Sequence, residues 1–178
     1  MSVFFVQFFK LPIICIIFGL FSLMFVELDR QAYESSNFNN SDSSIEIIES
    51  ISPSKEFIII SHGFAGSKEM MRQIAYDIAN AGSNAVLFDF IGHGSNQQKL
   101  VNQPAEITGT TQQLVAQLSD IIKSIYEKFG NEISISLVGH SMASDIVIRA
   151  SADERIKSVV AISPYSTGIT QDFPKDLL

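Results

Sequence analysis

The apolar residues of this chain follow two different patterns, one before and one after residue 30. Residues 3–26 are almost continuously apolar, and only Gln7, Lys10 and Ser22 are polar. A helix of about 20 apolar residues crosses the hydrocarbon core of a bilayer. A buried helix of a soluble domain would instead show a polar face. The pattern therefore predicts an N-terminal transmembrane helix within residues 1–30.

Two fates of this segment remain open, because a signal peptide also has an apolar run near the N-terminus. Residues 27–31 contain no small-x-small cleavage pattern, which favours an uncleaved anchor; a cleaved segment would make the protein secreted. Lys10 and the terminal amine precede the apolar core, and the charges just after it sum to a negative value. The positive-inside bias thus predicts a single-pass protein with a cytoplasmic N-terminus and the remainder outside, which is the periplasm in a bacterium.

Residues 31–44 are rich in Ser and Asn without an apolar period, which predicts a flexible linker. From residue 45 onward, short apolar runs alternate with stretches of helical period. The predicted strands are 45–51, 57–60, 85–88, 133–138 and 158–162, and the predicted helices are 67–81, 110–129 and 142–150. This alternation predicts an α/β domain over residues 45–178, in which parallel strands form a sheet between layers of helices.

Composition narrows the possible functions of this domain. The 178 residues are 46% hydrophobic and 17% charged, which excludes a disordered chain. A net charge of -7 argues against nucleic acid as a partner, because phosphates require clustered Lys and Arg. Cys15 is the one cysteine, so no disulfide framework is expected. No metal-ligand spacing, phosphate loop or dinucleotide fingerprint is present, and we expect no metal and no cofactor.

The most informative motif lies between the predicted strand 133–138 and the helix that follows it. In open α/β sheets, ligands bind at the carboxyl ends of the strands. Here the chain reads Gly139-His140-Ser141-Met142-Ala143. A tight turn that lifts a serine clear of the sheet strains its backbone, so the residues two positions away must be small. Gly139 and Ala143 satisfy this, although Ala143 stands where glycine is more usual, and Ser141 is the predicted nucleophile.

A second motif, His62-Gly63-Phe64, follows the predicted strand 57–60. The small Gly63 lets the backbone turn towards the serine. The N–H groups of Phe64 and Met142 are then predicted to face a developing oxyanion, and each such donor is worth roughly 3 kcal/mol of barrier.

Together these segments resemble the α/β-hydrolase family, and are most similar to its bacterial esterase, lipase and dienelactone-hydrolase-like branch. The resemblance covers about residues 45–166, in the family's order. Its motifs are His62-Gly63-Phe64, Asp89 with Gly92-His93-Gly94-Ser95, and Gly139-His140-Ser141-Met142-Ala143. The resemblance implies that Ser141 is the nucleophile and that Phe64 and Met142 form the oxyanion hole. It implies that the other motif residues, Asp89 and His93 among them, shape the turns beside the site.

The family's catalytic triad runs Ser, then Asp or Glu, then His along the chain. The three histidines here, His62, His93 and His140, all precede Ser141. We interpret His62 and His93 as hydrogen-bonding backbone groups, not as a substitute base. The triad acid and base are therefore expected to be absent from this chain. We expect a hydrolase domain truncated after the strand 158–162, whose apolar edge is left unpaired.

Two functions follow from these observations. The first is a serine hydrolase anchored to the membrane through residues 3–26, which acts on a small ester or related acyl substrate. Its base would come from outside this chain, for example from a separately encoded C-terminal half docked at the open edge. The alternative is a truncated, catalytically inactive hydrolase fragment or binding remnant.

Overall fold

The computed structural model describes residues 2–31, 33–40, 43–100 and 109–164. The chain divides into two units, Met1–Glu34 and Ser35–Leu178, which we describe separately. The first unit is the helix α1 (Ser2–Gln31), which continues through Pro12. Its window Leu11–Leu28 has a mean hydropathy of 2.4 and is long enough to cross a membrane. It has the properties of either a single membrane span or a signal sequence.

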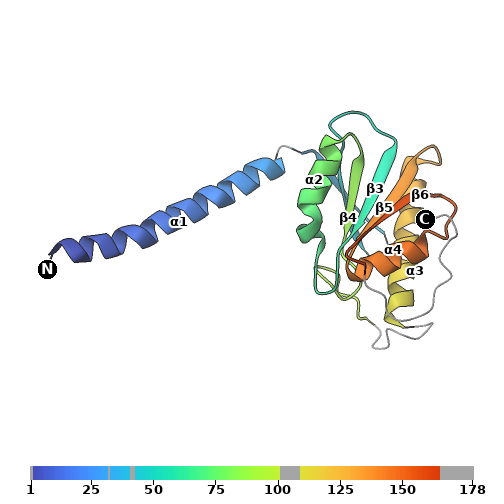
Figure 1. The fold of residues 1–178 in the computed structure, drawn as a ribbon. Coiled ribbons are helices and arrows are strands. Elements are labelled where there is room, and N and C mark those ends of the chain that lie inside the picture. The colour runs from blue at the N-terminus through green and yellow to red at the C-terminus, as the bar shows by residue number, and fades with distance from the viewer. Residues whose placement is uncertain (1, 32, 41–42, 101–108, 165–178) are drawn as a thin grey trace. The chain divides into compact units, whose positions relative to one another are not determined.

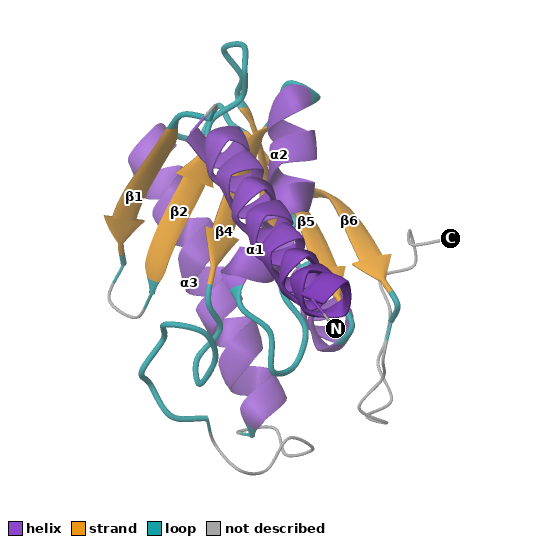
Figure 2. Cartoon of the chain, turned by 90° about the vertical axis from the view of Figure 1, so that its left-hand side faces the viewer, coloured by secondary structure: helices purple, strands orange, loops and turns teal. Residues whose placement is uncertain are grey.

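The second unit is built on a mixed six-stranded sheet (Figure 2). Its strands are β1 (Ser35–Asn39), β2 (Ser44–Ile48), β3 (Glu56–Ser61), β4 (Asn84–Phe88), β5 (Ser134–His140) and β6 (Ile156–Ile162). They lie in the order β1-β2-β4-β3-β5-β6. The strands from β3 to β6 are parallel, whereas β2 is antiparallel to both β1 and β4.

The prediction of parallel strands is therefore correct for β3 to β6 and wrong for β2. Antiparallel strands can be joined by a short turn, whereas parallel neighbours need a crossover of a dozen or more residues. Residues 40–43 are too few for a crossover between β1 and β2. The strand β1 also lies inside the predicted linker 31–44, where the polar sequence Ser-Ser-Asn-Phe-Asn carries no apolar alternation. Of its residues only Phe38 packs against the hydrophobic core.

Helices cover both faces of the sheet (Figure 1). One face carries α2 (Arg72–Asn80), which follows the 3₁₀ turn η1 (Lys68–Met71). The predicted helix 67–81 therefore begins with a tighter turn. The other face carries α3 (Thr110–Phe129) and α4 (Met142–Ala150), and both of these helices have the predicted bounds.

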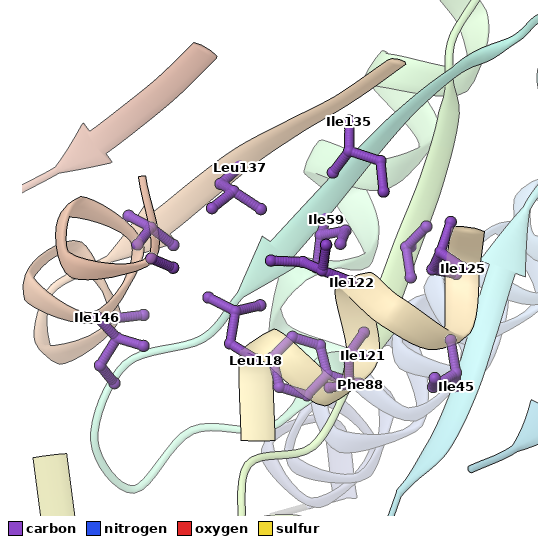
Figure 3. Close-up of a cluster of buried hydrophobic side chains, with 14 of the residues drawn as sticks. Ile45, Ile59, Phe88, Leu118, Ile121, Ile122, Ile125, Ile135, Leu137 and Ile146 are labelled. Atoms are coloured by element: carbon purple, nitrogen blue, oxygen red, sulfur yellow. The ribbon is translucent and has the colours of Figure 1, made fainter. Parts of the chain in front are cut away.

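The hydrophobic core lies between the sheet and the helices α3 and α4 (Figure 3). The helix α3 contributes a stripe of fully buried side chains at helical spacing, Leu114, Leu118, Ile121, Ile122 and Ile125. Full burial of each such side chain contributes about 1.5–3 kcal/mol. On the sheet, the buried side chains of the same core cluster include Ile45, Ile59, Phe88, Ile135 and Leu137. This packing fixes the carboxyl ends of β3, β4 and β5, where the candidate site residues lie.

The strand β6 forms one edge of the sheet. Among the described residues it pairs on one side only, with β5. Val160 of this strand is 53% exposed. The unpaired apolar edge expected from the sequence is thus present in the part of the chain that the structure describes.

Candidate active site

Ser141 lies in the turn that joins β5 to α4. Its backbone has φ 54° and ψ -116°, a left-handed conformation that non-glycine residues rarely adopt. Such strain costs about 1–3 kcal/mol and persists only where the surroundings enforce it. Here the Ser141 N–H donates to the carbonyl of Ile162 (2.8 Å), and the Ser144 N–H donates to the carbonyl of Ser141 (2.9 Å). The end of β6 and the first turn of α4 therefore hold the serine in place.

The small residues around Ser141 allow this turn to form. A Cβ at Gly139 would come within 2.7 Å of the Ala143 carbonyl carbon and overlap its oxygen. A Cβ at Gly63 would lie 3.1 Å from the Cβ of Ser141, so the segment after β3 packs directly against the serine. Ala143 is fully buried, and its methyl group is accommodated in the core cluster.

Two backbone N–H groups are available beside Ser141. Met142 is the first residue of α4, and the N–H groups of a first helical turn have no acceptor within the helix. Phe64 follows Gly63, which contacts the serine. Within the described residues, neither the Phe64 N–H nor the Met142 N–H donates a hydrogen bond. The two donors predicted for an oxyanion hole are thus unused.

His62 is buried, with 1% of its surface exposed, and both ring nitrogens are hydrogen-bonded. Nδ1 lies 2.9 Å from the carbonyl of Gly63, which can only accept, so Nδ1 carries the proton. Nε2 accepts from the Phe90 N–H at 3.1 Å and is therefore unprotonated. Burial, followed by the neighbouring His93, lowers the pKa of His62 more than the Gly63 carbonyl and Asp89 raise it. His62 is neutral and has no free nitrogen to take a proton from Ser141.

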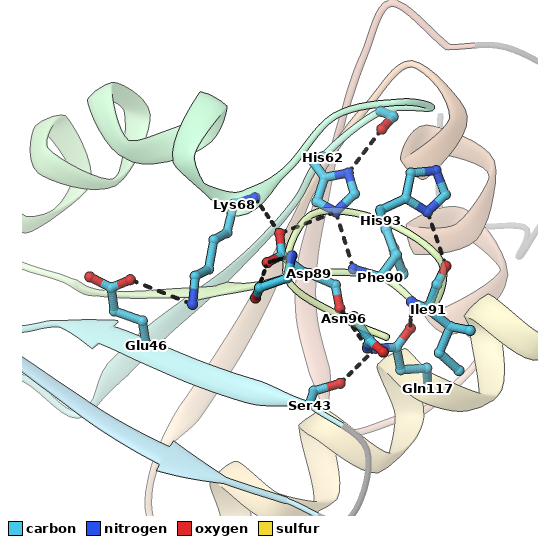
Figure 4. Close-up of polar contacts among 12 residues, drawn as sticks. Ser43, Glu46, His62, Lys68, Asp89, Phe90, Ile91, His93, Asn96 and Gln117 are labelled. Atoms are coloured by element: carbon cyan, nitrogen blue, oxygen red, sulfur yellow. Dashed lines mark hydrogen bonds and ion pairs between the residues drawn. The ribbon is translucent and has the colours of Figure 1, made fainter. Parts of the chain in front are cut away.

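Asp89 anchors the turn after β4 (Figure 4). Its carboxylate accepts from the Lys68 N–H (2.7 Å), the Ser95 N–H (2.9 Å) and the Ser95 hydroxyl (2.8 Å). Burial alone would raise the pKa of Asp89, but these donors outweigh it and hold the pKa below its usual value. Nε2 of His62 is 3.9 Å from this carboxylate, and because that nitrogen is unprotonated the contact is not an ion pair at neutral pH.

The remaining residues of this turn stabilise its backbone conformation. Gly92 and Gly94 have φ values of 74° and 52°, and a Cβ at Gly94 would overlap the Asp89 carboxylate. His93 is buried, donates from Nδ1 to the carbonyl of Ile91 (3.0 Å), and packs edge-on against the Phe64 ring at 5.7 Å. His140, by contrast, is exposed at the end of β5.

Sequence analysis missed a buried polar residue that holds this turn from the opposite side. Gln117 of α3 accepts from the Ile91 N–H (2.9 Å) and donates to the Asp89 carbonyl (3.1 Å) and the Ser43 hydroxyl (2.6 Å). The available signal was its position, three residues after Leu114 on the apolar stripe of α3. A polar side chain on a buried stripe must find internal partners.

A buried ion pair was missed in the same way. Glu46 interrupts the apolar run of β2, is 5% exposed, and receives two hydrogen bonds from Arg72, at 2.7 and 2.8 Å. Hydrogen bonds to Glu69, and then those to Glu46, raise the pKa of Arg72 above its usual value. This pair joins β2 to α2, whose preceding turn η1 supplies the Lys68 N–H to Asp89. Among the residues that the structure describes, no group of three His, Cys, Asp or Glu could hold a metal ion.

The strand order and the strained serine between β5 and α4 define an α/β-hydrolase fold. Residues 52–175 match the family described as "Serine aminopeptidase, S33", and the chain belongs to this family. The resemblance inferred from the sequence motifs is thereby confirmed. None of the curated proteins matches the sequence.

Solved structures with the same fold include three hydrolases. The esterase Pf2001 of Pyrococcus furiosus has 22% identity and a TM-score of 0.58, over 74% of this chain and 49% of that one. A thermostable carboxyl esterase of Bacillus coagulans has 16% identity and a TM-score of 0.59, over 72% and 43%. An α/β serine hydrolase homologue of Coxiella burnetii has 17% identity and a TM-score of 0.59, over 74% and 62%. The chain thus spans about half the length of the structures that it matches.

Proposed function

We propose that this protein is a serine hydrolase of carboxylic-ester or related acyl substrates, with Ser141 as its nucleophile. The observation that carries the proposal is the left-handed backbone of Ser141. Glycine would adopt this conformation without strain, yet a serine occupies it. The next residue, Met142, has an unused N–H, and so does Phe64, which follows the glycine that packs against the serine. Strained residues of this kind cluster where a reactive side chain must be held in one orientation. The ester-cleaving enzymes that share the fold support an ester as the substrate.

The proposed reaction is an acyl transfer in two steps. The Ser141 hydroxyl oxygen attacks the substrate carbonyl carbon, and the carbonyl oxygen becomes an oxyanion that accepts from the Phe64 and Met142 N–H groups. The alcohol then leaves with a proton, and water hydrolyses the acyl-serine ester. The proton of the hydroxyl goes to a base during the first step. His62 cannot accept it, because both of its nitrogens are engaged. No histidine follows Ser141 in this sequence, where the triad order would place the base, so the proposal assigns the base to a histidine outside this chain.

The apolar helix α1 bears on where in the cell this reaction takes place. As a single-pass anchor with a cytoplasmic N-terminus, it would hold the hydrolase domain against the outer surface of the membrane. As a cleaved signal it would release the same domain, so the proposed chemistry does not depend on which of the two applies.

A second candidate function is an inactive fragment or binding remnant of such a hydrolase. The neutral, doubly hydrogen-bonded His62 favours it, because this ring cannot take the proton of the Ser141 hydroxyl. Loss of the triad base costs about six orders of magnitude in turnover.

Chemical rescue separates these two functions. The full chain in detergent is treated with a fluorophosphonate, with and without added imidazole as a substitute base, and labelling is read by intact mass. We expect imidazole-dependent labelling that disappears in Ser141→Ala and remains in the control Ser158→Ala, which removes an exposed hydroxyl of β6. Equal labelling of the chain and of Ser141→Ala would contradict the hydrolase and support the remnant. Fast labelling without imidazole would keep Ser141 as nucleophile but contradict an external base.

A further inference from the structure

The Gly63 carbonyl and the Phe64 N–H belong to the same peptide unit. The described residues contain no cis peptide bond, so in this planar unit the N–H points opposite to the C=O. The Gly63 carbonyl accepts from Nδ1 of His62 (2.9 Å) and from the Gly66 N–H (3.0 Å). Whatever fixes the carbonyl therefore fixes the direction of the Phe64 N–H as well.

His62 is itself held rigidly. The Phe90 N–H donates to Nε2, which leaves Nδ1 as the protonated nitrogen (Figure 4). The ring packs edge-on against Phe90, with centroids 5.2 Å apart, and lies 5.3 Å from the His93 ring. The ring is 1% exposed, and a flipped ring would lose both hydrogen bonds in a place where water cannot replace them. One imidazole thus joins the turn after β3 to the turn after β4.

We propose that His62 is a positioning residue of the oxyanion hole, a neutral imidazole whose Nδ1–H holds the Gly63–Phe64 peptide in the orientation that leaves the Phe64 N–H free beside Ser141. The inference rests on the proposed function for its consequence, because a positioned N–H matters to the reaction only if Ser141 attacks a carbonyl. The hydrogen bonds themselves can be tested without any reaction.

The charge state of the ring is part of this arrangement. Protonation would put a second N–H on Nε2, directly opposite the Phe90 N–H, so two donors would face each other. The titratable groups closest to the ring are Asp89, whose carboxylate is 3.9 Å from Nε2, and His93. Asp89 is already occupied by the Lys68 and Ser95 donors, so it is poorly placed to compensate. Acid should therefore break the contact with the Phe90 N–H, whereas Nδ1 stays protonated and keeps its hydrogen bond to the Gly63 carbonyl.

Two substitutions of His62 separate its two hydrogen bonds. In His62→Asn the side-chain amide nitrogen takes roughly the place of Nδ1, which keeps the donor to Gly63 and loses the acceptor for Phe90. In His62→Gln the amide oxygen reaches roughly the place of Nε2, which keeps the acceptor and loses the donor. The matched pair differs by one methylene group, so unequal effects report which bond matters.

The test uses NMR of the isotope-labelled full chain in detergent, together with imidazole-rescued labelling of Ser141. We expect the imidazole nitrogen shifts of His62 to show the neutral Nδ1–H form at pH 7. The Gly63 carbonyl and Phe64 amide shifts should stay close to wild type in His62→Asn and move in His62→Gln. Labelling of Ser141 should slow at least about 10-fold in His62→Gln and less than about 3-fold in His62→Asn, since a whole oxyanion donor is worth 10²–10³-fold.

A charged or Nε2–H imidazole at pH 7, or equal shift changes in the two variants, would overturn the positioning role. If His62→Gln fails to fold, the tautomer of the wild-type ring and the shifts of His62→Asn still decide the question. A wild-type chain that shows no Ser141-dependent labelling contradicts the proposed function alone, because the tautomer and the shift comparison do not need the reaction.

Discussion

The turns after β4 and after β5 lie at the same end of the sheet and differ in how their polar groups are satisfied. After β4, the Asp89 carboxylate accepts three hydrogen bonds, and the carbonyl of the same residue accepts from Asn96 and Gln117. After β5, Ser141 has a strained backbone, and the N–H of the following Met142 has no partner among the described residues. The turn after β4 is saturated at Asp89, whereas the turn after β5 keeps one unused donor, the Met142 N–H.

This difference separates a structural turn from a candidate reactive one, although the two look alike in the sequence. Both contain a Gly-His pair close to a serine: Gly92-His93 before Ser95, and Gly139-His140 before Ser141. Met142 is half-buried and opens the first turn of α4, so its N–H has no acceptor within the helix and remains available to a ligand. The degree of hydrogen-bond satisfaction, and not the residue types, therefore marks the turn at which chemistry is proposed.

The largest effect is expected from breaking the saturated turn. Asp89→Ala removes the acceptor of the Lys68 and Ser95 donors, whose hydrogen bonds are partly buried. We expect the free energy of unfolding to fall by about 3–5 kcal/mol, since each of the three lost hydrogen bonds to a charged group contributes about 1.5–3 kcal/mol. Denaturant titration of the full chain in detergent measures this. Asp89→Asn keeps an oxygen for Lys68 and should lose clearly less, and a loss below about 1 kcal/mol in Asp89→Ala would show that the turn does not depend on its carboxylate.

The pH dependence of the free energy of unfolding tests the turn after β4 in a second way, with a smaller expected effect. The pKa of His62 is lowered from its usual 6.5 by burial first, so the unfolded chain binds a proton there more readily than the folded one. Stability is then fully present above pH 6.5 and declines as the pH falls towards the folded pKa. The pKa of Asp89 is also lowered, from 3.8, so a second loss begins below about that value. Neither loss should involve Ser141.

The measurement is the free energy of unfolding as a function of pH, for wild type and two variants. His62→Gln should remove the part of the loss that begins near pH 6.5, and Asp89→Asn the part that begins near 3.8. A loss near pH 6.5 that survives in His62→Gln would contradict the depressed pKa of the buried His62.

The sequence predicted the elements with a strong apolar pattern. The bounds of α3 and α4 follow from a stripe at helical spacing and from Gly130 after the last turn of α3, whose φ of 86° favours glycine. The strand β1 escaped prediction because Phe38 is its single apolar residue, and its pairing with β2 depends on a neighbour that the sequence pattern does not identify. The direction of β2 was missed because a short connection, and not its own residues, decides it.

In the candidate site, too, features set by neighbouring residues in the sequence could be predicted, and features set by distant partners could not. Ser141 could be found because its turn requires small residues at fixed positions in the sequence, Gly139 and Ala143. The connections of His62 and Gln117 could not, because their partners lie 28 and 26 residues away and are brought near only by the sheet and by the packing of α3. The tautomer of His62 in particular is set by the backbone N–H of Phe90, and no pattern of side chains in the sequence predicts that contact.

The smallest predicted effect lies in the strained turn and has the opposite sign to the first. Ser141→Gly should raise the free energy of unfolding by about 1 kcal/mol, because glycine adopts φ 54° without a Cβ clash and loses part of the gain to its greater freedom when unfolded. Ser141→Ala keeps the Cβ and should change stability by less than about 0.5 kcal/mol, which makes it the matched control for the loss of the hydroxyl. Denaturant titration of the three proteins side by side decides between strain and hydroxyl. A gain in Ser141→Gly alone means that the fold spends stability to hold Ser141 in place, whereas equal stability of all three would remove the strain on which the assignment of the nucleophile rests.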